Sequence, residues 1–177
     1  MRFTETPLVG AWVIDLDHRE DERGSFARTY DRAEFEARGM DLAVVQCNTS
    51  YNTRAGVLRG MHFQAEPHGE PKLVRCTRGA VFDVIVDLRP DSPTYRQWFG
   101  TELSVANGRA LYVPVAMAHG FQTLEDATEV LYMMGHAFMP EAARGVRWND
   151  PAFAIDWPPA EERIISQRDA SYADYVQ

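Results

Sequence analysis

Short runs of alternating apolar side chains recur along this chain, and they limit its fold more than any other feature of the sequence. The clearest run spans residues 80–88, where odd-numbered side chains would face one side of a strand and even-numbered ones the other. The odd-numbered face carries two carboxylates, Asp83 and Asp87. Similar runs cover residues 12–16, 42–47, 73–77, 98–103, 110–113, 120–124 and 129–134. Many short strands without helices between them predict an antiparallel sandwich or barrel rather than a parallel α/β sheet.

Two short helices are expected outside these strands. Residues 31–39 are the clearer candidate, because Asp31 can cap the helix, Glu34 completes a capping box and Gly39 can end it. A second helix is predicted over residues 169–175.

The chain is long enough for one domain and too short for two, so residues 1–177 are expected to form a single domain. The proline-containing stretch 151–159 is expected to be irregular and to wrap the outside of the sheets. No stretch approaches the ~18 apolar residues of a membrane span, and no long apolar core follows the N-terminus. The sequence therefore predicts a cytoplasmic protein without a membrane partner.

The charge balance excludes one class of partner. A net charge of -8 repels polyanions and gives no support to binding a nucleic acid polymer or an anionic membrane. A small phosphorylated ligand would need local cations, and Arg23, Arg28, Arg59 and Lys72 are the candidates.

The two cysteines, Cys47 and Cys76, lie in strand-like apolar runs at a spacing that fits no zinc motif. Free cysteines are among the most buried residue types. Both are therefore predicted to be buried free thiols.

The stretch 56–64, Gly-Val-Leu-Arg-Gly-Met-His-Phe-Gln, carries the first chemical signal. Its apolar residues can anchor a strand in a core while Arg59 and His62 are held toward a shared interior, and Lys72 follows eight residues after the stretch ends. Polar groups so placed are costly unless they have partners or a ligand. An inward histidine is then either a satisfied core residue or part of a site.

The block 114–121 places His119 where a loop turns back into a strand, and it resembles the second motif of cupins. The stretch around His62 resembles a degenerate first cupin motif. Metal-binding cupins carry a His-x-His pair and a carboxylate there, because the metal needs three or four ligands. Here the two positions at His-x-His spacing from His62 are occupied by Gly60 and Gln64, so the pair is absent. His62, His119 and Glu70 could still form a metal site, but the missing pair favours chemistry without a metal.

Without a metal, an inward imidazole can act as a general base near neutral pH, and such a base needs an orienting partner. Asp169 could fold back to provide that partner, or it could serve only as a helix cap on the surface. Tyr132 lies within the alternating run 129–134. Its hydroxyl is either a structural hydrogen-bonding group or a general acid. The residues alone leave both alternatives open.

An ordered series of motifs resembles the dTDP-4-dehydrorhamnose 3,5-epimerase family, and the ordered set is far more specific than any one motif. The series runs from Arg23 to Asp169 and includes residues 56–64, 72–75, 78–79, 82–89, 92–94, 114–121, 144–148, 150–151 and 155–158. The resemblance implies an all-β cupin jelly roll, or double-stranded β-helix, with a few short peripheral helices and no metal or other cofactor. It also implies a homodimer whose partner subunit contributes to nucleotide binding.

The same resemblance implies roles for individual residues. His62 resembles the base that removes the proton next to the sugar ketone, with Asp169 as its partner. Lys72 resembles the cation that stabilises the enolate oxygen, and Tyr132 the acid that returns a proton on the opposite ring face. The implied contacts to the nucleotide are Arg59 and His119 at the pyrophosphate, with Arg23, Gln46 and Asn48 as further residues of the nucleotide site.

Two residues depart from the family pattern. Arg28 stands where many members have a glutamate thought to read the thymine edge, and a cation cannot accept the base N–H as a carboxylate does. Phe138 stands where many relatives have tyrosine, and the lost hydroxyl would alter either the nucleotide contacts or the ring carbon that is epimerised. Both remain candidates for substrate binding, and the nucleotide base stays open.

The sequence therefore predicts metal-free epimerisation of a nucleotide-linked 4-keto-6-deoxy sugar at carbon 3, carbon 5 or both. Such a reaction needs a cation at the developing oxyanion and an acid across the ring from the base. Two rival hypotheses are a metal-dependent cupin oxygenase and a non-catalytic sugar-nucleotide binding protein. The presence of acid, base and cation together argues against the second.

Overall fold

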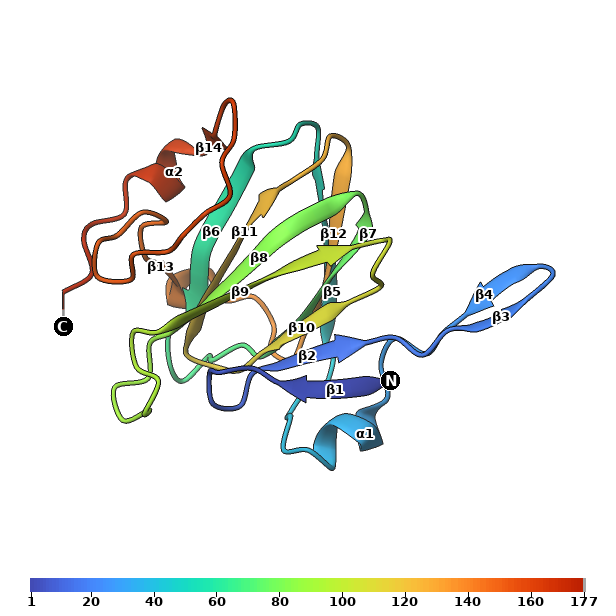
Figure 1. The fold of residues 1–177 in the computed structure, drawn as a ribbon. Helices are drawn as coiled ribbons and strands as arrows, with labels where there is room; N and C mark the ends of the chain where they lie inside the picture. Colours follow the sequence, from blue (N-terminus) through green and yellow to red (C-terminus); the bar gives the residue numbers. More distant parts are fainter. Residues whose placement is uncertain (177) are drawn as a thin grey trace.

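The computed structural model describes residues 1–176 and is built mainly of two β-sheets (Figure 1). The first sheet has the order β1 Arg2–Glu5, β2 Trp12–Asp15, β10 Ala110–Val113, β7 Lys72–Arg78, β12 Thr128–Met134 and β5 Gln46–Asn52. The second has the order β13 Ala143–Gly145, β6 Val57–Gln64, β11 Met117–Thr123, β8 Ala80–Asp87 and β9 Trp98–Ser104, with β14 Ile164–Ile165 added to β6. A separate hairpin, β3 Arg19–Asp21 and β4 Gly24–Phe26, projects from the body, and a 3-10 turn, η1, spans Pro140–Ala142. The predicted all-β jelly roll is confirmed.

Apolar side chains from both sheets meet in one core between them. Val74 of β7 and Val130 of β12 pack there in the same cluster as Ile85 of β8. A second cluster covers the outer face of the second sheet, where the irregular C-terminal segment packs onto β6 and β8 (Figure 1). This outer packing explains why the run 80–88 is apolar on both faces, and it confirms that the stretch 151–159 wraps the outside of the sheets.

Helix α1 spans Arg32–Glu36, which is shorter than the predicted range 31–39. Its predicted N-cap is confirmed, because the Asp31 carboxylate accepts the backbone N–H of Glu34. The predicted capping box is wrong, since the Glu34 carboxylate pairs with Arg38 at 2.9 Å instead of returning to the cap. The helix covers part of the outer face of the first sheet.

Helix α2 spans Gln167–Ala170, so the predicted range 169–175 is wrong. The Ser166 hydroxyl accepts the backbone N–H of Asp169 at 3.1 Å, and this cap starts the helix earlier than expected. Neither helix among the described residues has the length and apolar character needed to cross a lipid bilayer.

Most predicted strands are confirmed with shifted ends, but the range 42–47 is wrong. Strand β5 begins only at Gln46, and Leu42 instead packs in the cluster beside α1. Strands β1, β3, β4, β13 and β14 were not predicted, because their two to four residues show no alternation of apolar side chains. The prediction for Cys47 is also wrong: it lies exposed on the edge strand β5, whereas Cys76 is buried as predicted.

Two glycines allow β6 and β11 to approach closely. Gly60 has a φ of 136°, and a Cβ built on it would lie 2.6 Å from the Cα of Gly120. A Cβ built on Gly120 would lie 2.7 Å from the carbonyl oxygen of Arg59. Neither position therefore accepts a side chain. The close approach occurs where His62 and His119 stand opposite each other in the strand register.

Asp87 is a fully buried carboxylate at the end of β8. Burial alone would raise its pKa, but hydrogen bonds from Arg89, Ser92 and Thr94 outweigh burial and lower the pKa to about 2. The buried charge therefore ties the loop after β8 to the sheet.

Replacing Asp87 with Asn should lower the free energy of unfolding and flatten its dependence on pH. The pKa of Asp87 is about 2 in the folded protein and 3.8 for an unperturbed carboxyl, so its stabilising effect is complete above about pH 4 and is lost as the pH falls toward 2. That shift corresponds to about 2 kcal/mol. Urea unfolding across this range should show the wild type losing more stability than D87N, with the exposed Asp91→Asn as control. Equal slopes for wild type and D87N would contradict the assignment.

Candidate active site

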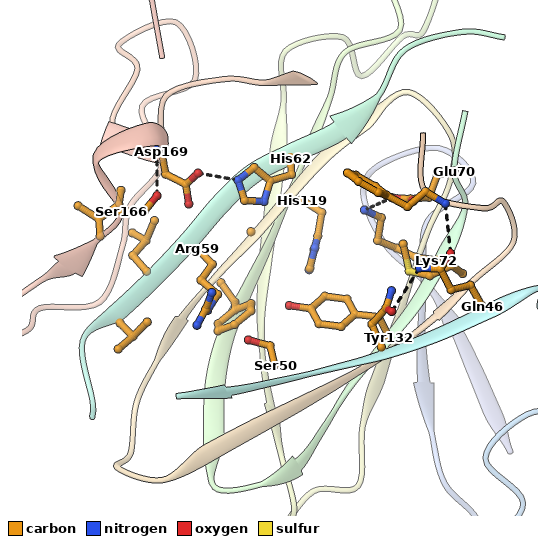
Figure 2. A pocket seen from close by; sticks show the side chains of 18 of the residues that line it. Gln46, Ser50, Arg59, His62, Glu70, Lys72, His119, Tyr132, Ser166 and Asp169 are labelled. Carbon is orange, nitrogen blue, oxygen red and sulfur yellow. Dashed lines mark hydrogen bonds and ion pairs between the residues drawn. The ribbon is translucent and has the colours of Figure 1, made fainter. Parts of the chain in front are cut away.

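A cavity of about 680 Å³ opens between the two sheets, beside the C-terminal segment (Figure 2). Its walls come from β5, β6, β7, β11, β12 and α2, which lie far apart in the sequence. Most of the site residues predicted from the sequence line it, namely Gln46, Asn48, Arg59, His62, Lys72, His119, Tyr132, Phe138 and Asp169. Arg23 and Arg28 do not.

His62 and Asp169 form a hydrogen-bonded pair although 107 residues separate them. Nε2 of His62 lies 2.8 Å from Oδ1 of Asp169, and Oδ2 accepts the backbone N–H of Gly60 at 3.3 Å. Burial acts to raise the pKa of Asp169, but the contacts with His62, Gly60 and Ser166 together lower it. The carboxylate therefore stays ionised and fixes the orientation of the imidazole. The His62 side chain is still 43% exposed, so its proton can exchange with water.

Lys72 and Glu70 form a buried ion pair in the cavity wall. Nζ of Lys72 lies 2.9 Å from Oε1 of Glu70, and the two side chains are only 6% and 7% exposed. A buried ammonium needs such a partner to keep its charge. Because Glu70 is committed to Lys72, it is not placed with the two histidines as a metal ligand. Within residues 1–176, no three His, Cys, Asp or Glu side chains are grouped so that they could hold a metal ion.

Tyr132 lies on the same sheet as Lys72, across the cavity from His62, and it contacts a second histidine–carboxylate pair. Its ring is edge-on to that of His119, with the centroids 6.1 Å apart. Nε2 of His119 lies 2.8 Å from Oδ1 of the fully buried Asp83. Burial and then the Asp83 charge raise the pKa of Tyr132 well above its usual value near 10, against smaller opposing effects of Arg59 and Ser50. Tyr132 therefore keeps its proton at neutral pH, as a general acid must.

A further part of the cavity offers groups suited to an anion and a flat ring. Nε of Arg59 donates to Oδ1 of Asn52 at 2.8 Å, which holds the guanidinium at the cavity. Gln46 donates to Asn48 at 3.2 Å and accepts the backbone N–H of Phe138, also at 3.2 Å. The Phe138 residue is 53% exposed and leaves one flat apolar surface open.

Arg23 and Arg28 lie away from the cavity of their own chain. Arg23 is at the turn of the projecting β3–β4 hairpin, where it pairs with Asp21 and its side chain is 84% exposed. Arg28 follows the hairpin and pairs with Asp31, the N-cap of α1. A single chain therefore does not bring these two cations into the site. Motif order could not reveal this, because it carries no information on where a hairpin points.

Two functional partners were missed in the sequence. Asp83 orients His119, and Asn52 orients Arg59. Asp83 had a usable signal, because it is a carboxylate on the core-facing side of an apolar strand and so requires a partner. Asn52 had none, since a polar residue near a strand end is ordinary.

The sequence model of the dTDP-4-dehydrorhamnose 3,5-epimerase family matches residues 5–176. This chain belongs to that family. A family 3,5-epimerase from Methanothermobacter thermautotrophicus is 44% identical over 97% of this chain and 92% of its own length. A dTDP-4-dehydrorhamnose 3-epimerase from Streptomyces niveus is 42% identical over 96% of this chain and 81% of its own. The crystal structure of the 3,5-epimerase from Bacillus anthracis with TDP and PPi bound is 40% identical, with a TM-score of 0.93 over 98% of this chain and 99% of that one.

Removing the Glu70 carboxylate should destabilise this member of the epimerase family. Glu70→Ala would leave Lys72 buried and unpaired, which lowers the free energy of unfolding by about 3–5 kcal/mol. Glu70→Gln keeps the shape and an acceptor oxygen and should cost less. Urea unfolding at neutral pH measures both, with the exposed Glu66→Gln as matched control. Wild-type stability in Glu70→Ala would show that Lys72 does not depend on this pair.

Proposed function

We propose that this chain epimerises a nucleotide-linked 4-keto-6-deoxy sugar of the dTDP-4-keto-6-deoxyglucose type, at carbon 3, carbon 5 or both, without a metal ion. The main support is that one cavity contains an oriented imidazole, a buried ammonium and a partly buried phenol. The imidazole comes from β6 and the phenol from β12, which belong to different sheets, so base and acid stand on different walls. Relatives named as 3,5-epimerases and as a 3-epimerase both match this chain, so either outcome is compatible with its family.

His62 acts as the base in the proposed first step. It takes the proton from the carbon next to the ketone, the C–H bond breaks, and its electron pair forms an enolate whose oxygen becomes negative. Lys72 supplies the positive charge for that oxygen, a type of interaction that contributes about 10²–10³-fold to rate. Asp169 keeps the imidazole oriented and stabilises the imidazolium that forms.

Tyr132 acts as the acid in the second step. It donates its proton to the same carbon from the opposite ring face, so that a new C–H bond forms with inverted configuration and Tyr132 becomes a phenolate. Water then returns a proton to the phenolate and removes one from His62, whose side chain is partly exposed. Return of the proton by His62 on the original face would restore the starting sugar. Exchange and inversion are therefore separable measurements.

We assign the remaining cavity residues to the nucleotide. Arg59 and His119 are suited to the diphosphate, because a chain of net charge -8 must supply local cations to hold an anionic ligand. Gln46, Asn48 and Phe138 are suited to the nucleoside, through amide hydrogen bonds and ring stacking. The relative from Bacillus anthracis crystallised with TDP and PPi supports a nucleotide site in this family.

We further propose a homodimer in which the β3–β4 hairpin of one subunit reaches the cavity of the other. The hairpin projects from the body of its own chain and all six of its strand residues are exposed (Figure 1). Phe26 is 71% exposed there, an apolar surface suited to contact with a second copy. Arg23 and Arg28 would then serve the cavity of the partner.

The proposal also includes the domain organisation and the cellular location of the chain. Residues 1–177 would act as one domain, because the C-terminal segment packs on the second sheet and supplies Asp169. A cytoplasmic location is supported by the two free thiols, since reducing compartments keep cysteines unpaired.

Deuterium exchange from solvent tests the proposed chemistry. With dTDP-4-keto-6-deoxyglucose in D₂O, NMR should show deuterium at carbon 3, carbon 5 or both, together with inversion there. His62→Ala should lower the rate of exchange about 10²–10⁴-fold, because it removes the base. Tyr132→Phe should keep exchange but lose inversion, and the exposed His18→Ala should behave as wild type. Absence of exchange at both carbons, with the substrate shown to bind, would exclude this function for this sugar.

Complementation between two inactive or weakened variants tests the shared site. His62→Ala lacks the base, and Arg23→Ala lacks the hairpin cation. If the hairpin serves the partner, a mixed dimer contains one cavity with both groups, and random mixing should restore about a quarter of the wild-type sites at low substrate concentration. If each hairpin serves its own chain, or the protein is monomeric by sedimentation, mixing will restore nothing.

A further inference from the structure

The Ser50 hydroxyl is a buried polar group of the cavity wall that the proposed mechanism has not used. Its oxygen is shielded from solvent and makes no hydrogen bond with any part of residues 1–176. Unpaired buried hydroxyls are uncommon in proteins, because leaving one unsatisfied costs free energy. This hydroxyl is therefore available for a group that needs a donor during turnover.

The register of the first sheet places Ser50 beside Tyr132. Strand β5 pairs with β12 so that Asn48 stands opposite Tyr132 and Ser50 opposite Val130. Residues two apart on a strand share a face, so Ser50 projects on the same side as the Tyr132 ring. Figure 2 shows the two hydroxyls next to each other at the cavity. They do not meet the geometry of a formed hydrogen bond, yet the Ser50 hydroxyl is near enough to act as a donor that lowers the pKa of Tyr132.

The state that needs such a donor is the Tyr132 phenolate. Burial and the Asp83 charge both disfavour a negative charge on the phenol oxygen. Two nearby donor atoms have other partners, since Nε of Arg59 is bound to Asn52 and Nε2 of His119 is directed at Asp83. A hydrogen bond to an ionised oxygen is stronger than one between neutral groups, so a free hydroxyl gains most at this step.

We propose that Ser50 is a positioning residue for Tyr132. The Ser50 hydroxyl donates a hydrogen bond to the phenol oxygen of Tyr132 as that oxygen loses its proton to the sugar carbon. The proposal rests on the proposed function, in which Tyr132 is the acid. In the step itself the Tyr132 O–H bond breaks, the enolate electron pair forms the new C–H bond, and the charge passes to the phenol oxygen. Ser50 keeps its own proton and shares it with that oxygen.

The ratio of inversion to exchange in D₂O tests this role. Ser50→Ala should leave exchange through His62 near the wild-type rate and lower inversion about 10- to 100-fold, the effect of losing one hydrogen bond to a charged group. Ser50→Thr keeps a hydroxyl and should restore most of the inversion. Thr49→Ala is the matched control, because Thr49 is the next residue on β5 and is exposed. Thermal unfolding and dTDP affinity, measured for each variant, should match the wild type.

Each contrary outcome has a distinct meaning. If Ser50→Ala inverts as well as the wild type while Tyr132→Phe does not, the role of Ser50 is overturned and the proposed function stands. If Ser50→Ala raises only KM, the hydroxyl contacts the substrate instead, which also overturns the positioning role. If Tyr132→Phe itself keeps inversion, the acid has been assigned wrongly and the proposed function fails with it.

Discussion

The contact between Gly60 and Gly120 is the constraint on which the site depends. A Cβ at either position would collide with the facing backbone, so the approach of β6 and β11 requires both glycines. That approach sets His62 and His119 side by side on the wall that the second sheet gives to the cavity. The Gly60 N–H also points away from the strand to the Asp169 carboxylate. A larger separation between β6 and β11 would change the distance between the two imidazoles. It would also move the Gly60 N–H that binds the Asp169 carboxylate.

Three of the cationic or basic side chains that line the cavity each have a carboxylate partner, whereas Arg59 is held by the amide of Asn52. The three pairs are His62–Asp169, Lys72–Glu70 and His119–Asp83. Buried carboxylates are a poor source of stability compared with apolar packing, so three such pairs around one cavity indicate selection for chemistry rather than for folding. The phenol is the exception, since the charge with the largest effect on its pKa is the Asp83 carboxylate, which opposes its ionisation. The cavity thus combines basic groups held beside carboxylates with a phenol that retains its proton.

The sequence predicted strands well where apolar and polar side chains alternate over several residues. The run 80–88 indicated both faces of β8, because both are buried by different clusters. Short strands and the exposure of Cys47 could not be predicted, since they depend on which sheet edge stays uncovered. Residue pairs distant in sequence were beyond local reasoning: the residues alone left Asp169 as either the partner of His62 or a surface helix cap, and only the family resemblance favoured the pairing. The position of Arg23 depends on where a hairpin points, and no pattern of residues encodes that direction.

The pair His62–Asp169 joins two segments that the ribosome makes at different times, because 107 residues separate them. The last long strand, β12, ends at Met134, and by then all strands of the first sheet and the four longest of the second have been made. Asp169 is made 35 residues later, and it reaches β6 only when the C-terminal segment has docked on the outer face. A nascent chain would therefore have most of its two main sheets formed while the His62 imidazole still lacked the carboxylate that fixes its orientation. The proposed base would gain that orientation only when the C-terminal segment docks on the second sheet.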